Sequence, residues 1–368
     1  MSSMNLKVGL IGLPNVGKST LFNALLKKRV ALSANYPFAT VEPNVGVVDV
    51  PDKRLQELAE LVKSEEHMDG LPPIVPAVVE FVDIAGLVKG ASTGAGLGNQ
   101  FLSHIREVDA IIHVLRDFED SNIVREGSEN PDSDRLTVET ELGLADLQTL
   151  EKLVVAQERE ARVVKDALED QKLEILKQVQ DDVTDGKIVG EYQIGDERLK
   201  AWFKTLPLLS IKPILYVYNV SESEYKSRST NRLLNENELI ICAKLEEELV
   251  DLPENERLDY LRELGIEQTG LELLIVKAYK QLGLISFLTE GKKEVRAWTI
   301  KGGNKAPKAA GVIHTDFEKN FIRAQVISCE ELLALGSLSK AKEAGKLRTE
   351  GKDYEVKDGD VIEFLVGN

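Results

Sequence analysis

One octapeptide decides the fold of this chain: Gly12-Leu13-Pro14-Asn15-Val16-Gly17-Lys18-Ser19. It matches the pattern G-x-x-x-x-G-K-[ST] at every fixed position, with an apolar run (6–11) before it and helix-like leucine spacing (19–28) after it. Such a loop closes backbone N–H groups on phosphates and adds the positive end of the following helix. In this pattern Lys18 reaches the β- and γ-phosphates, and the Ser19 hydroxyl ligates Mg²⁺. The stretch therefore predicts a nucleoside-triphosphate site.

Three further apolar runs indicate the sheet that carries this loop. They lie at 78–82, 110–115 and 213–218, and helical segments separate them. Near-continuous apolar strands that alternate with helices are typical of a parallel sheet covered on both faces. We therefore expect an α/β fold with the sheet of a P-loop NTPase at its centre.

Two segments differ from this pattern. Apolar positions recur in steps of three and four from Leu147 to Ile175, which predicts a long amphipathic helix folded back on a second one around Leu199, Trp202 and Phe203. This coiled-coil-like arm either stabilises only itself or reaches toward a partner. The tail has short β-rich runs and 14 Lys/Arg against 13 Asp/Glu, unlike the acidic remainder, and predicts a small α+β domain. The predicted domains are 1–139 and 205–285 for the P-loop domain, 140–204 for the inserted arm and 286–368 for the tail.

A second nucleotide motif ends the next apolar strand, Asp83-Ile84-Ala85-Gly86. In a D-x-x-G motif, Asp83 would hold Mg²⁺ through water and the Gly86 N–H would sense the γ-phosphate. Thr40 is a candidate for a second hydroxyl on Mg²⁺, although an ordinary loop threonine is the alternative. Together with the phosphate loop, these residues favour a GTPase-type switch over a motor or a kinase.

The residue after Gly86 differs from the residue that GTPase-type switches usually have at this position. Leu87 stands where many such enzymes have a glutamine that orients the attacking water, so we expect slow intrinsic hydrolysis. His113, in the strand after the switch, is a candidate for placing the water. Its alternative role is that of a core histidine with a backbone partner.

The base-reading motif departs as well. Asn219-Val220-Ser221-Glu222 stands where guanine readers have N-K-x-D, whose aspartate accepts hydrogen bonds from two guanine N–H groups at once. Glu222 is one methylene longer, and adenine offers only its exocyclic amino group as donor, so the change favours ATP. The alternative is that Glu222 is a solvated loop residue and that guanine still binds. Cys242-Ala243-Lys244 lies in the place of the S-A-K loop that supports the base.

Composition limits the remaining functions. The 368 residues carry 46 Lys/Arg and 62 Asp/Glu, a net charge of −16, which argues against broad attraction to DNA or RNA. Cys242 and Cys329 are too few for a disulfide framework or a zinc cluster. No run approaches the ~18 apolar residues of a membrane span, and no signal peptide is recognisable. We expect a cytoplasmic protein that partners neither membrane nor DNA.

With these motifs in place, the chain closely resembles the Obg-like ATPase (YchF) family of translation-factor-related P-loop NTPases. The resemblance covers essentially the whole chain. It rests on GLPNVGKST (12–20), NYPFAT (35–40), DIAGLVKGAS (83–92), GLGNQFLSHIR (96–106), NVSE (219–222) and the tail. It implies a G domain interrupted by a helical coiled-coil arm and followed by a TGS domain, a small ubiquitin-like β-grasp module. It also implies ATP preference on a GTPase fold.

The motifs and the resemblance together give a set of expected site residues. The expected nucleotide contacts are Asn15, Val16, Gly17, Lys18, Ser19, Thr20, Gly86, Asn219, Val220, Glu222, Cys242 and Ala243. The expected Mg²⁺ ligands are Ser19, Thr40 and Asp83. The family pattern has a histidine where His113 stands, so His113 joins Lys18 as a candidate catalytic residue. In related GTPases an asparagine placed like Asn15 supports a potassium ion, which makes K⁺ a second candidate cation.

The resemblance also points to partners. It implies ATP as the ligand and the ribosome as the partner, with the large subunit and tRNA as finer expectations. Because the chain is acidic, RNA contact would have to be local, from the tail or from Arg159, Arg162 and Lys165, which a solvated helix face would equally explain. We expect a slow, Mg²⁺-dependent ATPase that acts as a ribosome-bound switch. A GTPase with an altered base motif, and a protein that binds nucleotide only as an ordering ligand, remain alternatives.

Overall fold

The computed structural model describes residues 6–32, 44–86, 97–120, 129–187, 189, 192, 194–231, 234–266 and 268–367. The chain forms two compact units. The P-loop unit comprises residues 7–46 and 81–271, and the C-terminal unit comprises 1–6, 47–80 and 272–368. The four domains predicted from the sequence stay a prediction.

The first sheet carries the phosphate loop. Its strands are β1 (Lys7–Ile11), β2 (Val45–Asp49), β4 (Val78–Asp83), β5 (Ala110–Asp117), β6 (Ile214–Val220) and β7 (Glu238–Ile241). They lie in the order β2-β4-β1-β5-β6-β7, and the pairs β1–β5, β5–β6 and β6–β7 are parallel. The four strands predicted from apolar runs are β1, β4, β5 and β6, and the predicted P-loop α/β fold is confirmed.

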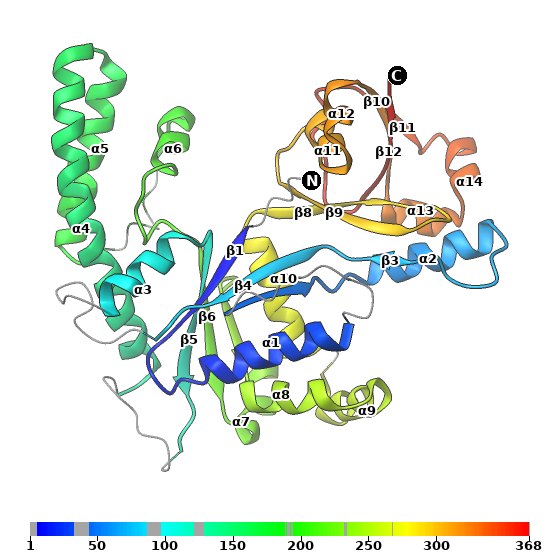
Figure 1. Ribbon diagram of the computed structural model, residues 1–368, viewed down its shortest axis with the longest axis horizontal. Coiled ribbons are helices and arrows are strands. Elements are labelled where there is room, and N and C mark those ends of the chain that lie inside the picture. The colour runs from blue at the N-terminus through cyan, green and yellow to red at the C-terminus, as the bar shows by residue number, and fades with distance from the viewer. Residues whose placement is uncertain are drawn as a thin grey trace. The chain divides into compact units, whose positions relative to one another are not determined.

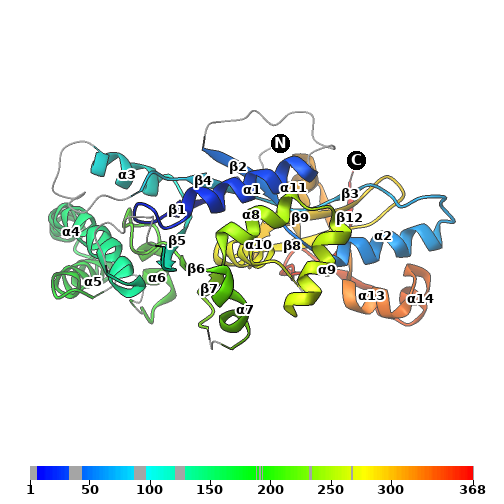
Figure 2. The same ribbon diagram turned by 90° about the horizontal axis from the view of Figure 1, so that it is seen from below.

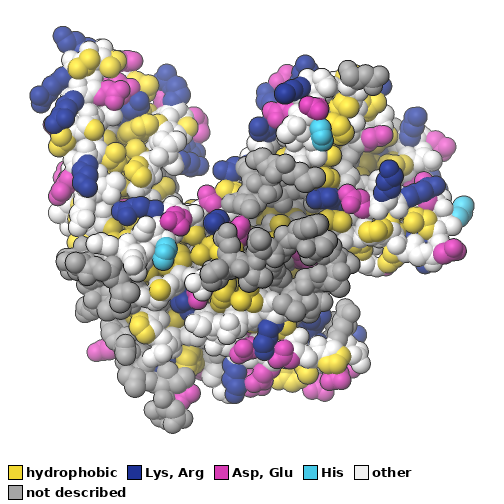
Figure 3. Space-filling model, viewed as in Figure 1, with side chains coloured by type: hydrophobic (Ala, Val, Ile, Leu, Met, Phe, Trp, Pro, Cys, Tyr) yellow, Lys and Arg dark blue, Asp and Glu magenta, His cyan; other side chains and the backbone are white. Residues whose placement is uncertain are grey.

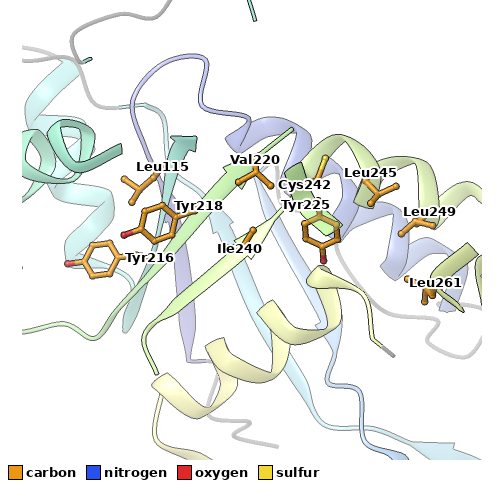
Figure 4. Close-up of a cluster of buried hydrophobic side chains, with 10 residues drawn as sticks. All are labelled: Leu115, Tyr216, Tyr218, Val220, Tyr225, Ile240, Cys242, Leu245, Leu249 and Leu261. Atoms are coloured by element: carbon orange, nitrogen blue, oxygen red, sulfur yellow. The ribbon is translucent and has the colours of Figure 1, made fainter. Parts of the chain in front are cut away.

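Helices surround this sheet because the strands are apolar on both faces. The helices of this unit are α1 (Lys18–Leu32), α3 (Leu97–Arg106), α7 (Glu222–Asn231), α8 (Ala243–Asp251) and α9 (Glu254–Leu264), whereas α10 (Gly270–Gln281) falls almost wholly in the C-terminal unit. Figure 2 shows α1 beside α8, and the Lys27 ammonium lies 2.8 Å from Asp251 of α8. Figure 4 shows the buried side chains between β6, β7, α7 and α8, among them Val220 and Cys242. This core fixes the loops at the carboxyl ends of the strands.

A long helical hairpin interrupts the P-loop unit. It consists of α4 (Pro131–Val164), α5 (Ala167–Thr184) and the short α6 (Glu197–Phe203). Figures 1 and 2 both show α4 and α5 side by side. The amide of Gln157 donates to Glu169 (2.7 Å), and the Lys177 ammonium lies 2.8 Å from the Glu158 carboxylate. Apolar residues of both helices, including Leu150 and Leu176, share one core.

The predicted long helix was wrong in one respect. Its seam from Leu147 to Ile175 was expected to run along a single helix that pairs near Trp202. In the structure α4 ends at Val164, the left-handed backbone of the following Lys165 (φ 53°) reverses the chain, and Asp166 caps the start of α5. The apolar seam therefore lies on two antiparallel helices that pack on each other.

Asp146 anchors the middle of α4 to the segment before β6. Its carboxylate is fully buried and accepts hydrogen bonds from the backbone N–H groups of Leu209 (2.7 Å) and Ser210 (2.9 Å) and from the Ser210 hydroxyl. Burial raises the pKa of the Asp146 carboxyl, against the opposite effect of these hydrogen bonds. A carboxylate held in this way satisfies backbone donors that have no access to water.

We expect Asp146→Ala to lower the free energy of unfolding by about 3 kcal/mol, because it leaves two buried N–H groups without an acceptor. Urea denaturation followed by circular dichroism measures this. Glu160→Ala, at an exposed position of the same helix, is the matched control and should change stability by less than about 0.5 kcal/mol. A loss below about 1 kcal/mol for the Asp146 variant would contradict the anchoring role.

The C-terminal unit contains a second sheet. Its strands are β3 (Ile74–Val75), β8 (Leu284–Thr289), β9 (Val295–Lys301), β10 (Phe321–Ser328), β11 (Arg348–Glu350) and β12 (Asp360–Val366), in the order β11-β10-β12-β8-β9-β3. Its helices are α2 (Lys53–Glu65), α11 (Ala306–Ile313), α12 (Thr315–Lys319), α13 (Cys329–Leu335) and α14 (Leu338–Glu343). Residues 74–75, far from the tail in sequence, pair with β9.

Over the described ranges, none of the helices combines the length and apolar character that a membrane crossing requires.

Candidate functional site

The phosphate loop, residues 12–19, connects β1 to α1. Asn15 (φ 62°) and Gly17 (φ 90°) have left-handed backbones, and the Leu21 N–H donates to the Gly17 carbonyl (3.0 Å) at the start of the helix. A Cβ at Gly12 would lie 2.7 Å from the carbonyl oxygen of Val114, and one at Gly17 would overlap the amide of Asn219. Close approach of a neighbouring segment therefore requires both glycines, and at Gly17 the left-handed backbone requires glycine as well.

The D-x-x-G motif lies directly beside this loop. Asp83 ends β4, and the following Ile84 N–H donates to the Leu10 carbonyl of β1 (3.1 Å). The Lys18 ammonium forms an ion pair with the Asp83 carboxylate. A Cβ at Gly86 would lie 3.3 Å from the Gly12 carbonyl oxygen. The two motifs thus form one site, as the sequence predicts.

The donors present suit magnesium. Ser19 has an exposed side chain in the first turn of α1, and Asp83 offers a carboxylate; hydroxyl and carboxylate oxygens are ligands that Mg²⁺ prefers. No group of three or more His, Cys, Asp or Glu side chains in the described part of the chain is arranged to hold a metal without help. A metal here would depend on hydroxyl and phosphate oxygens, as in other P-loop proteins. Thr40 and Leu87 lie outside the described residues.

Asn219 joins the phosphate loop to the end of β7. Its side chain is 5% exposed. The amide Nδ2 donates to the Val16 carbonyl (2.9 Å), and Oδ1 accepts from the Ala243 N–H at the start of α8 (2.9 Å). Both ends of the amide are thus used in holding two loops together. The sequence singled out Asn219 for base contact and missed this bridge.

The rest of the base-reading segment divides into buried and exposed residues. Val220 and Cys242 are each 2% exposed and belong to one apolar cluster (Figure 4), so only their backbones are available to a nucleotide. Burial raises the pKa of the Cys242 thiol. Glu222 is exposed at the start of α7 and accepts a hydrogen bond from the Tyr260 hydroxyl of α9 (3.1 Å). No sequence motif pointed to Tyr260.

His113 occupies a different environment. It is 1% exposed, and among the described residues neither ring nitrogen has a hydrogen-bond partner. Val114 turns its Cβ toward Gly12, and because side chains alternate along a strand, His113 faces the other side, where its ring lies 6.0 Å from that of Tyr216. Burial lowers the pKa of His113 to about 3, and the nearby Arg135 adds to this effect, so the imidazole is neutral at pH 7.

The predicted site residues therefore fall into two groups. The structure brings together residues 12–20, Asp83, Gly86, Asn219 and Ala243 at the carboxyl ends of β1, β4, β6 and β7. It places His113 apart from them, on the face of the sheet where its ring lies beside that of Tyr216 on β6. The sequence did not point to the residues around His113. The signal available for Tyr216 was that its apolar strand could pair with the apolar strand that contains His113. The ligand roles of all these residues stay a prediction.

Comparison with known proteins identifies the family. The model described as a 50S ribosome-binding GTPase matches residues 7–140, and the YchF-GTPase C-terminal model, described as a protein of unknown function, matches 284–367. The protein named ribosome-binding ATPase YchF from Bacillus subtilis is 48% identical over 373 residues, which cover 98% of this chain and 99% of that protein. The chain belongs to the YchF family. The YchF protein of Escherichia coli O157:H7, of the same name, is 46% identical, covering 98% and 99% of the two chains.

A solved YchF structure extends the similarity to the fold. The structure of the Schizosaccharomyces pombe YchF GTPase covers 99% of this chain and 99% of its own, with a TM-score of 0.84 and 35% identity. The resemblance stated from the sequence is therefore confirmed for YchF. Its Obg-like part is corrected, because Obg-like proteins are a related but different family.

Proposed function

We propose that this protein is a slow, Mg²⁺-dependent ATPase that binds the ribosome and acts as a nucleotide-controlled switch. The observation that carries the proposal is the assembled phosphate loop, which Asn219 fastens to the start of α8. The full-length relatives support it, since they are named ribosome-binding ATPases at 46–48% identity. ATP and ribosome are thus the proposed partners, and the cytoplasm is the proposed location. Neither a membrane nor DNA is part of the proposal.

Each residue of the loop has a defined part in phosphate binding. The left-handed backbones of Asn15 and Gly17 turn backbone N–H groups inward, where the positive end of α1 also favours phosphate oxygens. Lys18 would exchange its partner Asp83 for the β- and γ-phosphates. Ser19, Asp83 and Thr40 would hold Mg²⁺, which when bound neutralises charge that develops on the phosphates. Asn15 is also the proposed support for a potassium ion.

Base selection is the second step of the proposal. The base would contact Asn219 and Val220, with Cys242 and Ala243 in the loop that supports it, whereas Thr20 belongs with the phosphate contacts. Because the Val220 side chain is buried, it cannot cover the base as the lysine of a guanine reader would. Glu222 is held by Tyr260, away from the position of an aspartate one methylene shorter. These features favour adenine over guanine.

Hydrolysis and ribosome contact form the finer part of the proposal. With Leu87 unable to orient water, His113 is the proposed group that does so, by hydrogen bonding to water through its neutral ring, since a pKa lowered to about 3 makes the ring a weak base. The helical hairpin is proposed as a coiled-coil arm and the tail as a TGS β-grasp domain. Together they would contact the large ribosomal subunit near tRNA. Arg159, Arg162 and Lys165 near the end of the arm are the proposed RNA contacts.

Calorimetric titration with Mg·ATP and, separately, Mg·GTP tests the nucleotide assignment. We expect ATP to bind at least tenfold more tightly, by ~1.4 kcal/mol, for the reasons of base geometry given above. Removing Mg²⁺ with a chelator is the control and should weaken both. Tighter binding of GTP would contradict the ATPase assignment and favour a GTPase, which is the activity in the name of the S. pombe protein. If the rate of single-turnover hydrolysis is the same with and without ribosomes, the nucleotide would act only as a ligand that orders the protein.

A further inference from the structure

The second sheet opens beside the end of β8. Strands β8 and β12 run parallel, with Leu288 opposite Val361. Strand β8 ends at Thr289, whereas β12 continues along β10 to Val366. A cavity of about 340 Å³ lies where the two strands part, and residues of both strands line it. We call this cavity the β8–β12 pocket.

Part of the pocket lining is apolar. It is formed by the side chains of Ile327, Leu338, Leu347 and Val361. Ile327 and Val361 are register partners on β10 and β12, so they lie on the same face of the sheet. Leu338 begins α14 and Leu347 precedes β11, so that neighbouring segments complete the apolar surface. Such a surface favours the methylene groups of a ligand over water.

Two carboxylates complete the lining. Glu290 follows the paired residue Leu288 at the same spacing as Glu363 follows Val361, so both side chains belong to the same face of the sheet. Across the described ranges, neither carboxylate forms an ion pair with a lysine or an arginine. The pocket therefore combines an apolar surface with negative charge that has no cation beside it.

Several other acidic groups of the C-terminal unit have basic neighbours. The Lys305 ammonium lies 2.7 Å from the Asp353 carboxylate, and the Lys346 ammonium lies 3.1 Å from that of Glu331. Figure 3 shows acidic and basic side chains mixed in this way on the visible face of the unit. Glu290 differs from these groups, because its described surroundings supply no such partner.

The pocket also disfavours the negative charge of Glu290. Burial raises the pKa of its carboxyl to about 7, and neighbouring carboxylates add to this effect. These neighbours are Glu65 and Glu66 at the end of α2 and Glu363 on β12. Lys292 is already paired with Glu66 (2.5 Å). A cation bound in the pocket would stabilise the ionised carboxylate that the fold leaves uncompensated.

We propose that the β8–β12 pocket binds an aliphatic amine, with its ammonium group at the Glu290 and Glu363 carboxylates and its methylene stem against the apolar surface. An ammonium group has three N–H donors, so it can bond two carboxylates at once. A metal ion fits less well, because the described residues contain no group of three or more His, Cys, Asp or Glu side chains arranged to hold one. The same chemistry is found in a free diamine and in the lysine side chain of a partner protein.

Saturation-transfer NMR of the full chain tests the proposal with butylamine, which copies the end of a lysine side chain. Phosphate buffer is used, because an amine buffer would compete for the carboxylates. We expect butylamine to bind with a dissociation constant below about 1 mM. Butanol, which has the stem without the charge, should not bind at the same concentration. Ammonium chloride, which has the charge without the stem, should not displace butylamine.

Two variants remove different parts of the pocket. Glu290→Gln keeps the shape of the side chain and removes its charge, and we expect it to weaken butylamine binding at least tenfold. Leu347→Trp keeps both carboxylates and fills the cavity from a partly exposed position, and it should cause a similar loss. Glu343→Gln, at an exposed position of α14, is the matched control for the change in net charge. It should leave the affinity within about twofold of wild type.

The outcomes decide between an amine site and general attraction to an acidic protein. Butylamine binding that survives both Glu290→Gln and Leu347→Trp, in variants that melt like wild type, would overturn the proposal. No binding to wild type at up to ~10 mM butylamine would overturn it as well. Tighter binding of diaminobutane than of Nα-acetyl-lysine amide would assign the pocket to a free diamine. The opposite order would assign it to a lysine of a partner protein. Because all the residues involved belong to the C-terminal unit, these results do not depend on the proposed ATPase.

Discussion

Asn219→Ala is expected to weaken Mg·ATP binding by about 100-fold, or ~2.7 kcal/mol. The side chain makes two hydrogen bonds of 2.9 Å, one to the Val16 carbonyl and one from the Ala243 N–H, and it is 5% exposed. Removing it leaves both backbone groups without their partner and frees the phosphate loop from the start of α8. Each such loss costs about 1–3 kcal/mol, part of which appears as lost affinity and part as lost stability.

Calorimetric titration of the variant measures the affinity, and circular dichroism checks that it is folded. Asn235→Ala is the matched control, because this asparagine is exposed just before β7 and should leave ATP affinity unchanged. Asn219→Asp should fall between the two, since it can still accept from Ala243 but cannot donate to Val16. An affinity for ATP within about tenfold of wild type in Asn219→Ala would show that the bridge is not needed.

His113→Ala is expected to slow single-turnover hydrolysis by about 10²- to 10⁴-fold, the usual contribution of a general acid or base. In this structure the ring packs beside Tyr216, on the face of β5 away from the phosphate loop, so a loss of this size would mean that the ring moves to the phosphates during hydrolysis. The effect of the substitution on ATP affinity should be small. The combination of a large loss in rate and an unchanged dissociation constant identifies a group that acts in the transition state. Quenched-flow measurement of phosphate release with ribosomes present gives the rate.

His104→Ala is the control for histidine removal, since His104 is exposed on α3. It should hydrolyse ATP at the wild-type rate. If His113→Ala retains more than about a third of that rate, His113 is a core residue and the water is oriented by another group. A matching loss of stability in His113→Ala would point the same way.

The sequence predicted those parts of the site that depend on local chemistry. The phosphate loop requires glycine where the backbone is left-handed or approaches another chain segment; Gly17 meets both conditions and Gly12 meets the second. Asp83 was predicted beside the loop because both motifs follow apolar strands of one sheet, and the ion pair with Lys18 fits that placement. These features need only a short stretch of sequence and the rules of parallel sheets.

The sequence could not predict contacts that depend on tertiary packing. The Tyr260–Glu222 hydrogen bond joins residues 38 positions apart, and Tyr216–Glu139 joins residues 77 apart. The reversal at Lys165 was missed for a local reason. A lysine in a left-handed conformation has no sequence signal, whereas glycine is the usual residue there, and the apolar seam continues across the break.

The way in which the chain is divided has a consequence for deletion experiments. The C-terminal unit is assembled from three separate stretches, because residues 47–80 belong to it. Strand β3 pairs with β9, and the buried face of α2, which includes Leu58 and Val62, belongs to the same unit. A protein shortened before residue 286 would lose β9 and expose these apolar side chains, so it would tend to aggregate. Loss of ribosome binding in such a fragment would then report misfolding, and point substitutions on the intact chain are the informative experiment.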